Sequence, residues 1–182
     1  AGKLVKTGAG TLLLSGANSF TGGLTIEQGG IETTLSGTLA DTLAVSVEDA
    51  GSFIWGSDDV IASLKNAGIT RIHAFASMEE LANSGLLDLD AQLQVTGTLT
   101  NEQAGTVNFA PGSAATLGAL INDGTLTNAG QLVVTGHADN RAGATLDLAN
   151  GSQNTFGSLA NAGLVTSAAS ISGVDSFTQT AG

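Results

Sequence analysis

At 182 residues, the chain is long enough for one domain with a substantial core, or for one block of a longer repetitive rod. It combines 26 glycines, one proline, no cysteine and 12% charged residues with a hydrophobic fraction of 42%, which argues against disorder and excludes disulfides and cysteine-based zinc or redox sites. A net charge of −11 disfavours nucleic acid and anionic membranes as partners.

The apolar residues come in short bursts. No burst approaches the roughly 18 residues that cross a bilayer, so we expect no direct membrane insertion by this segment. The chain opens Ala1-Gly2-Lys3, without an initiator methionine and without the features of a signal peptide. We therefore expect residues 1–182 to form a single β-structured segment of a larger protein, with any targeting signal elsewhere.

The first thirty residues contain two pairs of aliphatic residues at period two. Leu12 and Leu14 form the first pair, Leu24 and Ile26 form the second, and glycine-rich turns separate them. This spacing predicts short strands with one face buried. Phe20, in the turn between them, is expected to cap or fill the interior.

The same stretch reads LVKTGAGTLLLSGANSFTGGLTI from Leu4 to Ile26. It closely resembles the autotransporter-associated β-helix repeat, in which a lysine-threonine-glycine turn, alternating leucines, a turn through asparagine and an aromatic residue, and threonine-glycine-glycine precede a further strand. The resemblance covers about one sixth of the chain. It implies a right-handed parallel β-helix from a bacterial passenger protein that is exported across the outer membrane to the cell surface or secreted.

From residue 57 to residue 85 the periodicity changes. Ser57-Asp58-Asp59 has the composition of a helix N-terminus, Val60, Ile61 and Leu64 would share one helical face, and Gly68 could end the helix. A strand is expected over residues 69–75, and Ser77-Met78-Glu79-Glu80 has the spacing of a capping box for a second short helix ending at Gly85. This pattern predicts a helical insertion or a pair of decorated coils over residues 57–85.

A Leu-x-Asn-x-Gly motif recurs along the chain and is expected to separate strands. Asparagine tolerates a left-handed conformation and glycine accepts positive φ, so we assign these residues to turns. Leu99-Thr100-Asn101 followed by Gly105 is a lengthened copy. The predicted structural turn residues are Asn66, Asn83, Asn122, Asn128, Asn161, Gly68, Gly85, Gly124, Gly130 and Gly163.

Between the copies, aliphatic residues alternate with Thr, Ser, Gln or Asp, as at Leu132 and Val134 or at Leu146 and Leu148. A β-sandwich or barrel would also have short strands, but normally with more aromatics and prolines. We therefore predict an all-β, parallel β-helix of about seven to nine coils of roughly 20 to 25 residues, rising about 35 to 45 Å. Leu120 and Leu126 lie six residues apart, so their motif copies must occupy different corners of one coil.

Few residues have the chemistry of a catalytic or metal site. His73 and His137 have no second histidine or cysteine at metal-binding spacing and are expected to be ordinary surface or strand residues. No serine has the setting of a nucleophile elbow or a serine protease. Asp88 and Asp90 would project from one strand face about 7 Å apart, as clustered carboxylates do in polysaccharide-cleaving β-helices, but only Arg71 and Arg141 could bind an anionic sugar nearby.

The remaining acidic pairs and glycine pairs have simpler explanations. Asp58-Asp59 and Glu79-Glu80 suit helix N-termini. Gly22-Gly23 and Gly29-Gly30 suit turns and not phosphate-binding loops, because no lysine-serine helix start follows them. We therefore expect no catalytic residue, no metal and no cofactor.

These patterns favour a non-catalytic scaffold that acts in adhesion or self-association. Its expected partners are host or bacterial surface molecules or other copies of itself. Two alternatives remain open: a glycan-processing β-helix, and an inert spacer that presents another domain.

Overall fold

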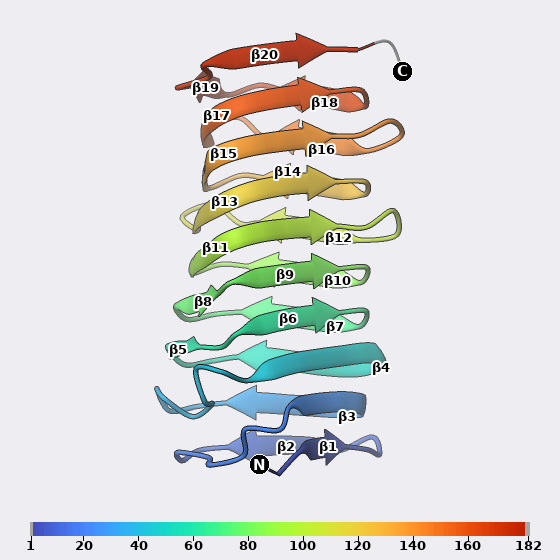
Figure 1. Cartoon of the computed structure of the whole chain (residues 1–182), viewed down its shortest axis with the longest axis vertical. Helices are drawn as coiled ribbons and strands as arrows, with labels where there is room; N and C mark the ends of the chain where they lie inside the picture. The colour runs from blue at the N-terminus through green and yellow to red at the C-terminus, as the bar shows by residue number, and fades with distance from the viewer. Residues whose placement is uncertain (1, 181–182) are drawn as a thin grey trace.

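The computed structural model describes residues 2–180 as a parallel β-solenoid of about nine coils (Figure 1). Its twenty strands belong to one sheet, in which every pairing is parallel and joins one coil to the next. The part of the chain from residue 2 to residue 180 contains no helix, so none of it could span a membrane as a helix.

Each coil has three faces, which we call A, B and C in the order in which the chain visits them. Short strands occupy single faces. On face A these are β5 (Asp59–Val60), β8 (Ala76–Met78) and β19 (Ser170–Ser172). On face B they are β1 (Leu4–Lys6), β6 (Ser63–Asn66), β9 (Glu80–Asn83) and β20 (Ser176–Gln179). On face C they are β2 (Thr11–Leu14), β7 (Ile69–Ile72), β10 (Leu86–Leu89), β12 (Thr106–Phe109), β14 (Thr125–Asn128), β16 (Thr145–Leu148) and β18 (Leu164–Ser167).

Longer strands bend around a corner. β3 (Leu24–Thr33) and β4 (Ala44–Trp55) run from face B to face C. β11 (Gln92–Asn101), β13 (Ala114–Asn122), β15 (Gln131–Asn140) and β17 (Gln153–Asn161) run from face A to face B, and their register shifts at the bend.

The coils are somewhat shorter than the sequence suggested. Leu64 pairs with Leu81, 17 residues further along, whereas Val95 pairs with Leu117, 22 residues further along. Much of this variation lies in the turns, because the strands themselves stay in register from coil to coil. At about 4.8 Å per coil, nine coils rise roughly 43 Å, within the expected length.

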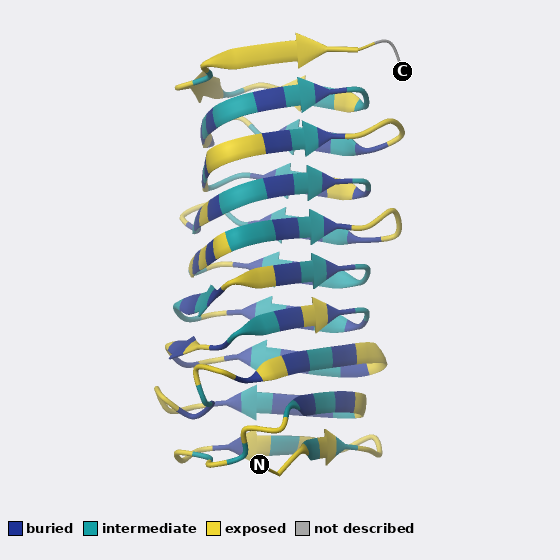
Figure 2. Cartoon of the chain, viewed as in Figure 1, coloured by how far each residue is buried: buried dark blue, intermediate teal, exposed yellow. Residues whose placement is uncertain are grey.

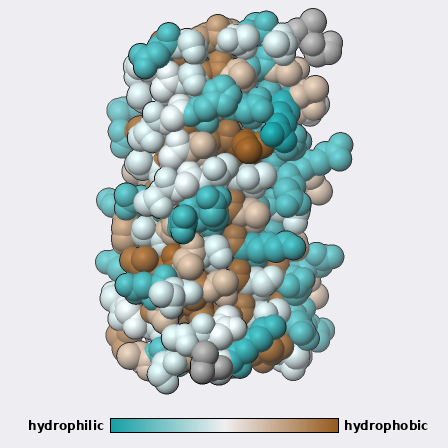
Figure 3. All heavy atoms as spheres, in the orientation of Figure 1, coloured by the Kyte–Doolittle hydropathy of each residue, from teal (hydrophilic) through white to brown (hydrophobic). Residues whose placement is uncertain are grey.

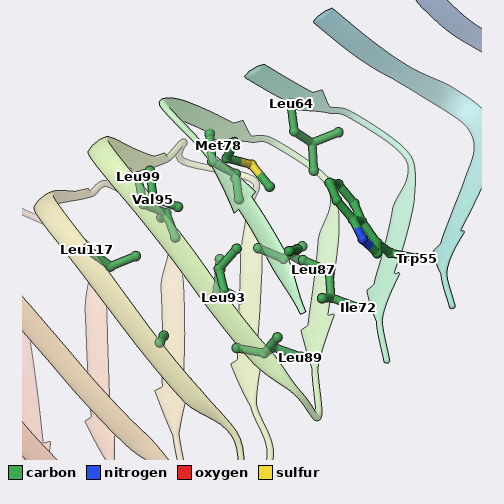
Figure 4. Packing of buried hydrophobic residues seen from close by; sticks show 14 of the residues in the cluster. Trp55, Leu64, Ile72, Met78, Leu87, Leu89, Leu93, Val95, Leu99 and Leu117 are labelled. Atoms are coloured by element: carbon green, nitrogen blue, oxygen red, sulfur yellow. The ribbon is translucent and has the colours of Figure 1, made fainter. Parts of the chain in front are cut away.

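The period-two pattern determines which side chains enter the core. In β10, Leu87 and Leu89 are buried while Leu86 and Asp88 are only half-buried. The same alternation appears as dark bands along every central strand (Figure 2). Inward residues of successive coils stack into columns, as Met78, Val95 and Leu117 do in Figure 4. Burying these columns of aliphatic side chains is the main stabilising contribution to the fold.

Residues 57–85 form two ordinary coils, so the predicted helical excursion is wrong. They contain β5 to β9, and the expected strand after residue 69 is present as β7. Ile61 and Leu64 are both buried, as a helical face would require, but a corner between face A and face B brings them inward. Val60, which would share that helical face, is exposed.

The acidic residues that suggested helix caps bind backbone groups of neighbouring coils. Asp58 accepts a hydrogen bond from the N–H of Phe75 at 3.0 Å. The buried Asp59 carboxylate accepts from the N–H groups of Leu39 at 2.9 Å and Val60 at 3.0 Å. Burial raises the pKa of Asp59, and these hydrogen bonds partly oppose that rise. The residue types that cap a helix thus serve here to hold corners together.

The first coils lack a strand on face A and use irregular segments there. Residues 15–23 and 34–43 fill this position, and the N–H of Asn18 donates to the carbonyl of Thr38 at 3.1 Å. Phe20 is half-buried and packs against the core, in agreement with its expected role as a cap.

A row of small residues lines the corner between faces B and C. Gly85 lies directly above Gly68, and a Cβ atom on Gly85 would approach the carbonyls of Gly68 and Ala67 more closely than real Cβ atoms do. The row continues upward through Gly105 and Gly124 to Ala144. Ala144 is the member of this row that carries a Cβ atom, and it follows a longer turn.

We predict that Gly85→Ala destabilises the solenoid by about 1 to 3 kcal/mol, because the backbone of two adjacent coils must separate to admit the methyl group. Gly10→Ala is the control, since a Cβ there meets nothing within 4 Å. Urea unfolding of both variants measures the effect. Equal stabilities for the two would contradict the close approach of the coils at Gly85.

Candidate functional site

The repeated asparagines point into the solenoid. Asn66, Asn83, Asn122 and Asn161 each occupy the last position of a strand on face B, and Asn128 occupies the last position of β14 on face C. All five are buried. The structure therefore divides the predicted set between two corners, as the six-residue spacing of Leu120 and Leu126 required.

Asparagines on face B form a continuous ladder of side-chain amides. In each step the Nδ2 group of one asparagine donates to the Oδ1 atom of the asparagine one coil later. The donor–acceptor distances are 2.7 Å from Asn66 to Asn83, 2.9 Å from Asn83 to Asn101, 2.8 Å from Asn101 to Asn122, 2.7 Å from Asn122 to Asn140 and 2.7 Å from Asn140 to Asn161. We call these six residues the asparagine ladder.

Each Nδ2 group uses its second hydrogen on the backbone. Asn101 donates to the carbonyl of Thr125 at 3.0 Å, and Asn122 donates to that of Thr145 at 2.9 Å. These carbonyls lie just after the turn between faces B and C in the next coil. The ladder thus connects each coil to the next through side chain and backbone together, and it satisfies polar groups that would otherwise be buried without partners.

Different side chains close the two ends of the ladder. At the lower end, the buried hydroxyl of Thr70 donates to Asn66 Oδ1 at 3.0 Å. At the upper end, Asn161 donates to Gln179 Oε1 at 2.8 Å, and Gln179 is exposed. All amides in the ladder therefore point the same way, with their N–H groups toward the C-terminal end of the solenoid.

Asn128 belongs to a separate, shorter arrangement. Its Nδ2 donates to Asn154 Oδ1 at 2.8 Å, and Asn154 donates to Ser152 Oγ at 2.9 Å. Both asparagines are buried. They lie near the corner between faces C and A and link β14 to β17, in coils that the asparagine ladder also joins.

The physical reason predicted for these residues was wrong. Within residues 2–180 no residue other than glycine has positive φ, so the asparagines are not left-handed turn residues. Gly68, Gly85, Gly124, Gly130 and Gly163 also lack positive φ, and each instead allows the close approach of the preceding coil. The motif ends a strand with an inward amide and then turns over a neighbouring backbone.

Three amides of these networks were not among the predicted site residues. Asn101 was recognised only as a lengthened copy, because three residues separate it from Gly105. Asn140 follows Ala138 where the motif has leucine, and Asn154 has no following glycine two residues on. Their positions within the strands could have identified these three residues as inward, because each pairs in register with an inward residue of the next or previous coil.

The outer surface of face C carries the acid pair that the sequence singled out. Asp88 accepts a hydrogen bond from Asn108 Nδ2 at 2.9 Å and lies 3.7 Å from Arg71 Nε. Asp90 contacts His73 Nδ1 at 2.8 Å. These side chains and Ala110 line a shallow depression above the buried Leu89 and Phe109. The two carboxylates are thus held apart by different neighbours and do not share a partner.

Other polar side chains of interest are similarly dispersed. His137 Nδ1 lies 2.8 Å from Ser158 Oγ at the corner between faces A and B. Arg141 binds Asp123 and Asp139, each at 3.0 Å, and the two carboxylates raise its pKa. Across residues 2–180, no three His, Cys, Asp or Glu side chains are grouped so that they could hold a metal ion.

We predict that Asn122→Leu destabilises the fold by on the order of 3 kcal/mol, because it leaves a donor of Asn101 and an acceptor of Asn140 buried without partners. Asn150→Leu is the control, since Asn150 is exposed in a turn. Thermal and urea unfolding of both variants decide the matter. A loss for Asn122→Leu no larger than that for the control would mean that the ladder adds little stability.

Comparison with known proteins gives one match. Residues 4–32 match the family model described as Passenger-associated-transport-repeat. No curated protein and no solved structure matches the chain. The matched residues contain β1 and β2 and reach into β3, which is the first coil and the beginning of the second. The family match and the stacked parallel coils agree: residues 4–32 are similar to a passenger-associated transport repeat, and they lie in a β-solenoid that fits an autotransporter passenger β-helix.

Proposed function

We propose that this segment is a non-catalytic scaffold of a surface-exposed or secreted passenger and that it acts in adhesion or self-association. The observation that carries the proposal is the contrast between a continuous, closely packed interior and outer faces that repeat hydroxyl and amide side chains from coil to coil. Such faces offer many similar contacts at the spacing of the strands.

The outer rows consist largely of small polar residues. On face C the first outward position is Thr106 in β12, Thr125 in β14 and Thr145 in β16, and leucines occupy it in β10 below and β18 above. The surface in Figure 3 alternates hydrophilic and hydrophobic residues without a single large apolar area. A surface of this mixed composition favours contacts that are individually weak and whose binding free energies sum along a rod.

The family match supports export, because a passenger repeat implies presentation at the cell surface or secretion. Accordingly, we propose host or bacterial surface molecules, or other copies of the chain, as partners. The glycan-processing alternative would rely on Asp88 and Asp90. Asp88 already binds Arg71 and Asn108, and Asp90 binds His73, so neither carboxylate is poised as a lone acid or nucleophile.

We predict weak self-association that strengthens as ionic strength rises from about 10 mM to physiological values. The net charge of −11 repels two copies at low salt, and the Debye length falls to about 8 Å at physiological salt. Sedimentation equilibrium at high micromolar concentration measures it. A monomer under both conditions would contradict self-association and favour receptor binding or an inert spacer.

A further inference from the structure

From β11 upward, charged residues are absent from the outward positions of face A. These positions are occupied only by Gln, Ala, Thr, Val and Ser. We call them the uncharged strip: Gln92, Gln94, Ala114, Thr116, Gln131, Val133, Gln153, Thr155, Ser170 and Ser172. Below it, Ser77 in β8 and Val60 in β5 continue the same row. The strip runs along the full C-terminal half of the solenoid.

The charges of that half of the chain lie elsewhere. Glu102, Asp123 and Arg141 belong to the turns between faces B and C, Asp139 lies on face B and Asp147 on face C. Asp175 stands at the edge of the last coil, just before β20. Two copies of this acidic chain can therefore approach most closely through face A, because like charges face one another there least.

The strip also has free hydrogen-bonding groups. Gln92, Gln94, Gln131 and Gln153 are exposed, and within residues 2–180 their side chains make no hydrogen bond. The inward amides of the asparagine ladder, by contrast, are fully engaged. The glutamine amides thus remain available to a partner.

Two shallow hollows mark the strip, and Ala114 lines both of them. One lies between Gln92, Gln94 and Thr116. The other lies between the turn at Gly112 and the turn at Gly151, beside Gln131 and Gln153. A short side chain at Ala114 between longer ones leaves room for a side chain from a facing surface.

We propose that the uncharged strip is the contact face between two copies of this chain, packed antiparallel about a two-fold axis that runs along the strands between β13 and β15. This inference rests on the self-association proposed above and specifies its surface. The partner of face A is face A of a second copy.

The two-fold axis makes the strip complementary to itself. It places Gln131 of one copy opposite Ala114 of the second, so that a long side chain enters a hollow at both symmetry-related places. It also places Gln92 opposite Gln153, where the two amides can bond to each other, and Thr116 opposite Val133. A closed two-fold contact of this kind repeats every interaction twice.

The size of the strip accounts for weak binding. Five coils at about 4.8 Å and four residues at about 3.3 Å give a face of roughly 300 Å² on each copy, well below the roughly 800 Å² per partner of stable complexes. A single segment should therefore associate only at high concentration, and a longer rod would gain from multivalency.

The test adds one negative charge to the strip and the same charge to another face of the same coil. Gln131→Glu places a carboxylate in the proposed contact, and Thr125→Glu places one on exposed face C. Sedimentation equilibrium at physiological salt should show the dissociation constant of Gln131→Glu raised at least about tenfold and that of Thr125→Glu changed less than about twofold. Circular dichroism melts confirm that both variants fold.

A mixing experiment tests the orientation. Ala114→Lys alone should also weaken self-association, whereas an equimolar mixture of Ala114→Lys and Gln131→Glu should associate at least as tightly as the unsubstituted chain, since opposite charges then face each other. Failure of the mixture to associate would overturn the two-fold arrangement.

The results separate the two proposals. Equal weakening by Gln131→Glu and Thr125→Glu, with the unsubstituted chain still associating, would overturn the assignment to face A but leave self-association intact. An unsubstituted chain that stays monomeric at every salt concentration would overturn both.

Discussion

The stacking of each coil on the one before it is the constraint on which the rest of the structure depends. A parallel solenoid pairs the backbone of every coil with both neighbours, so an inward side chain in one coil fixes what its neighbours must present. This constraint is strongest in the asparagine ladder, because each amide there needs a hydrogen-bonding side chain in both the preceding and the following coil. Its closure by Thr70 and Gln179 shows that even the ends of the row require polar partners.

The sequence predicts the parallel β-solenoid because aliphatic residues at period two, separated by short turns, recur in almost every coil. It did not predict the coils of residues 57–85 correctly. Ser57 to Asp59 and Ser77 to Glu80 have the composition of helix caps, but a solenoid corner also needs side chains that accept backbone hydrogen bonds, and spacing alone does not separate the two.

The asparagines were found by their repetition, but their role was not. A turn residue and an inward ladder residue can occupy the same short motif, and only the pairing between coils distinguishes them. Asn140 is an example. It does not match the motif, because Ala138 replaces the leucine and the turn that follows is longer, yet its amide is buried in the ladder like that of Asn122. Long-range register, which sequence spacing does not specify when coil length varies, decides its place.

The inward-facing and outward-facing side chains of the solenoid are under different constraints. The interior must repeat, whereas the outer rows are free to vary, and they distribute charge unevenly around the solenoid. Faces B and C and the turns between them carry the carboxylates of the upper coils, apart from Asp175 at the edge of the last coil, while face A carries amides and hydroxyls. A rod of this kind can present distinct surfaces to different surroundings without any change in its core.

A continuous, buried amide ladder holds successive coils in register. Hydrogen exchange of the asparagine side-chain amides, followed by NMR, tests this role. We expect the Nδ2 protons of Asn83, Asn101, Asn122 and Asn140 to exchange as slowly as the backbone amides of the central strands, while those of the exposed Asn150 exchange freely. Rapid exchange at all five residues would contradict a buried, continuous ladder.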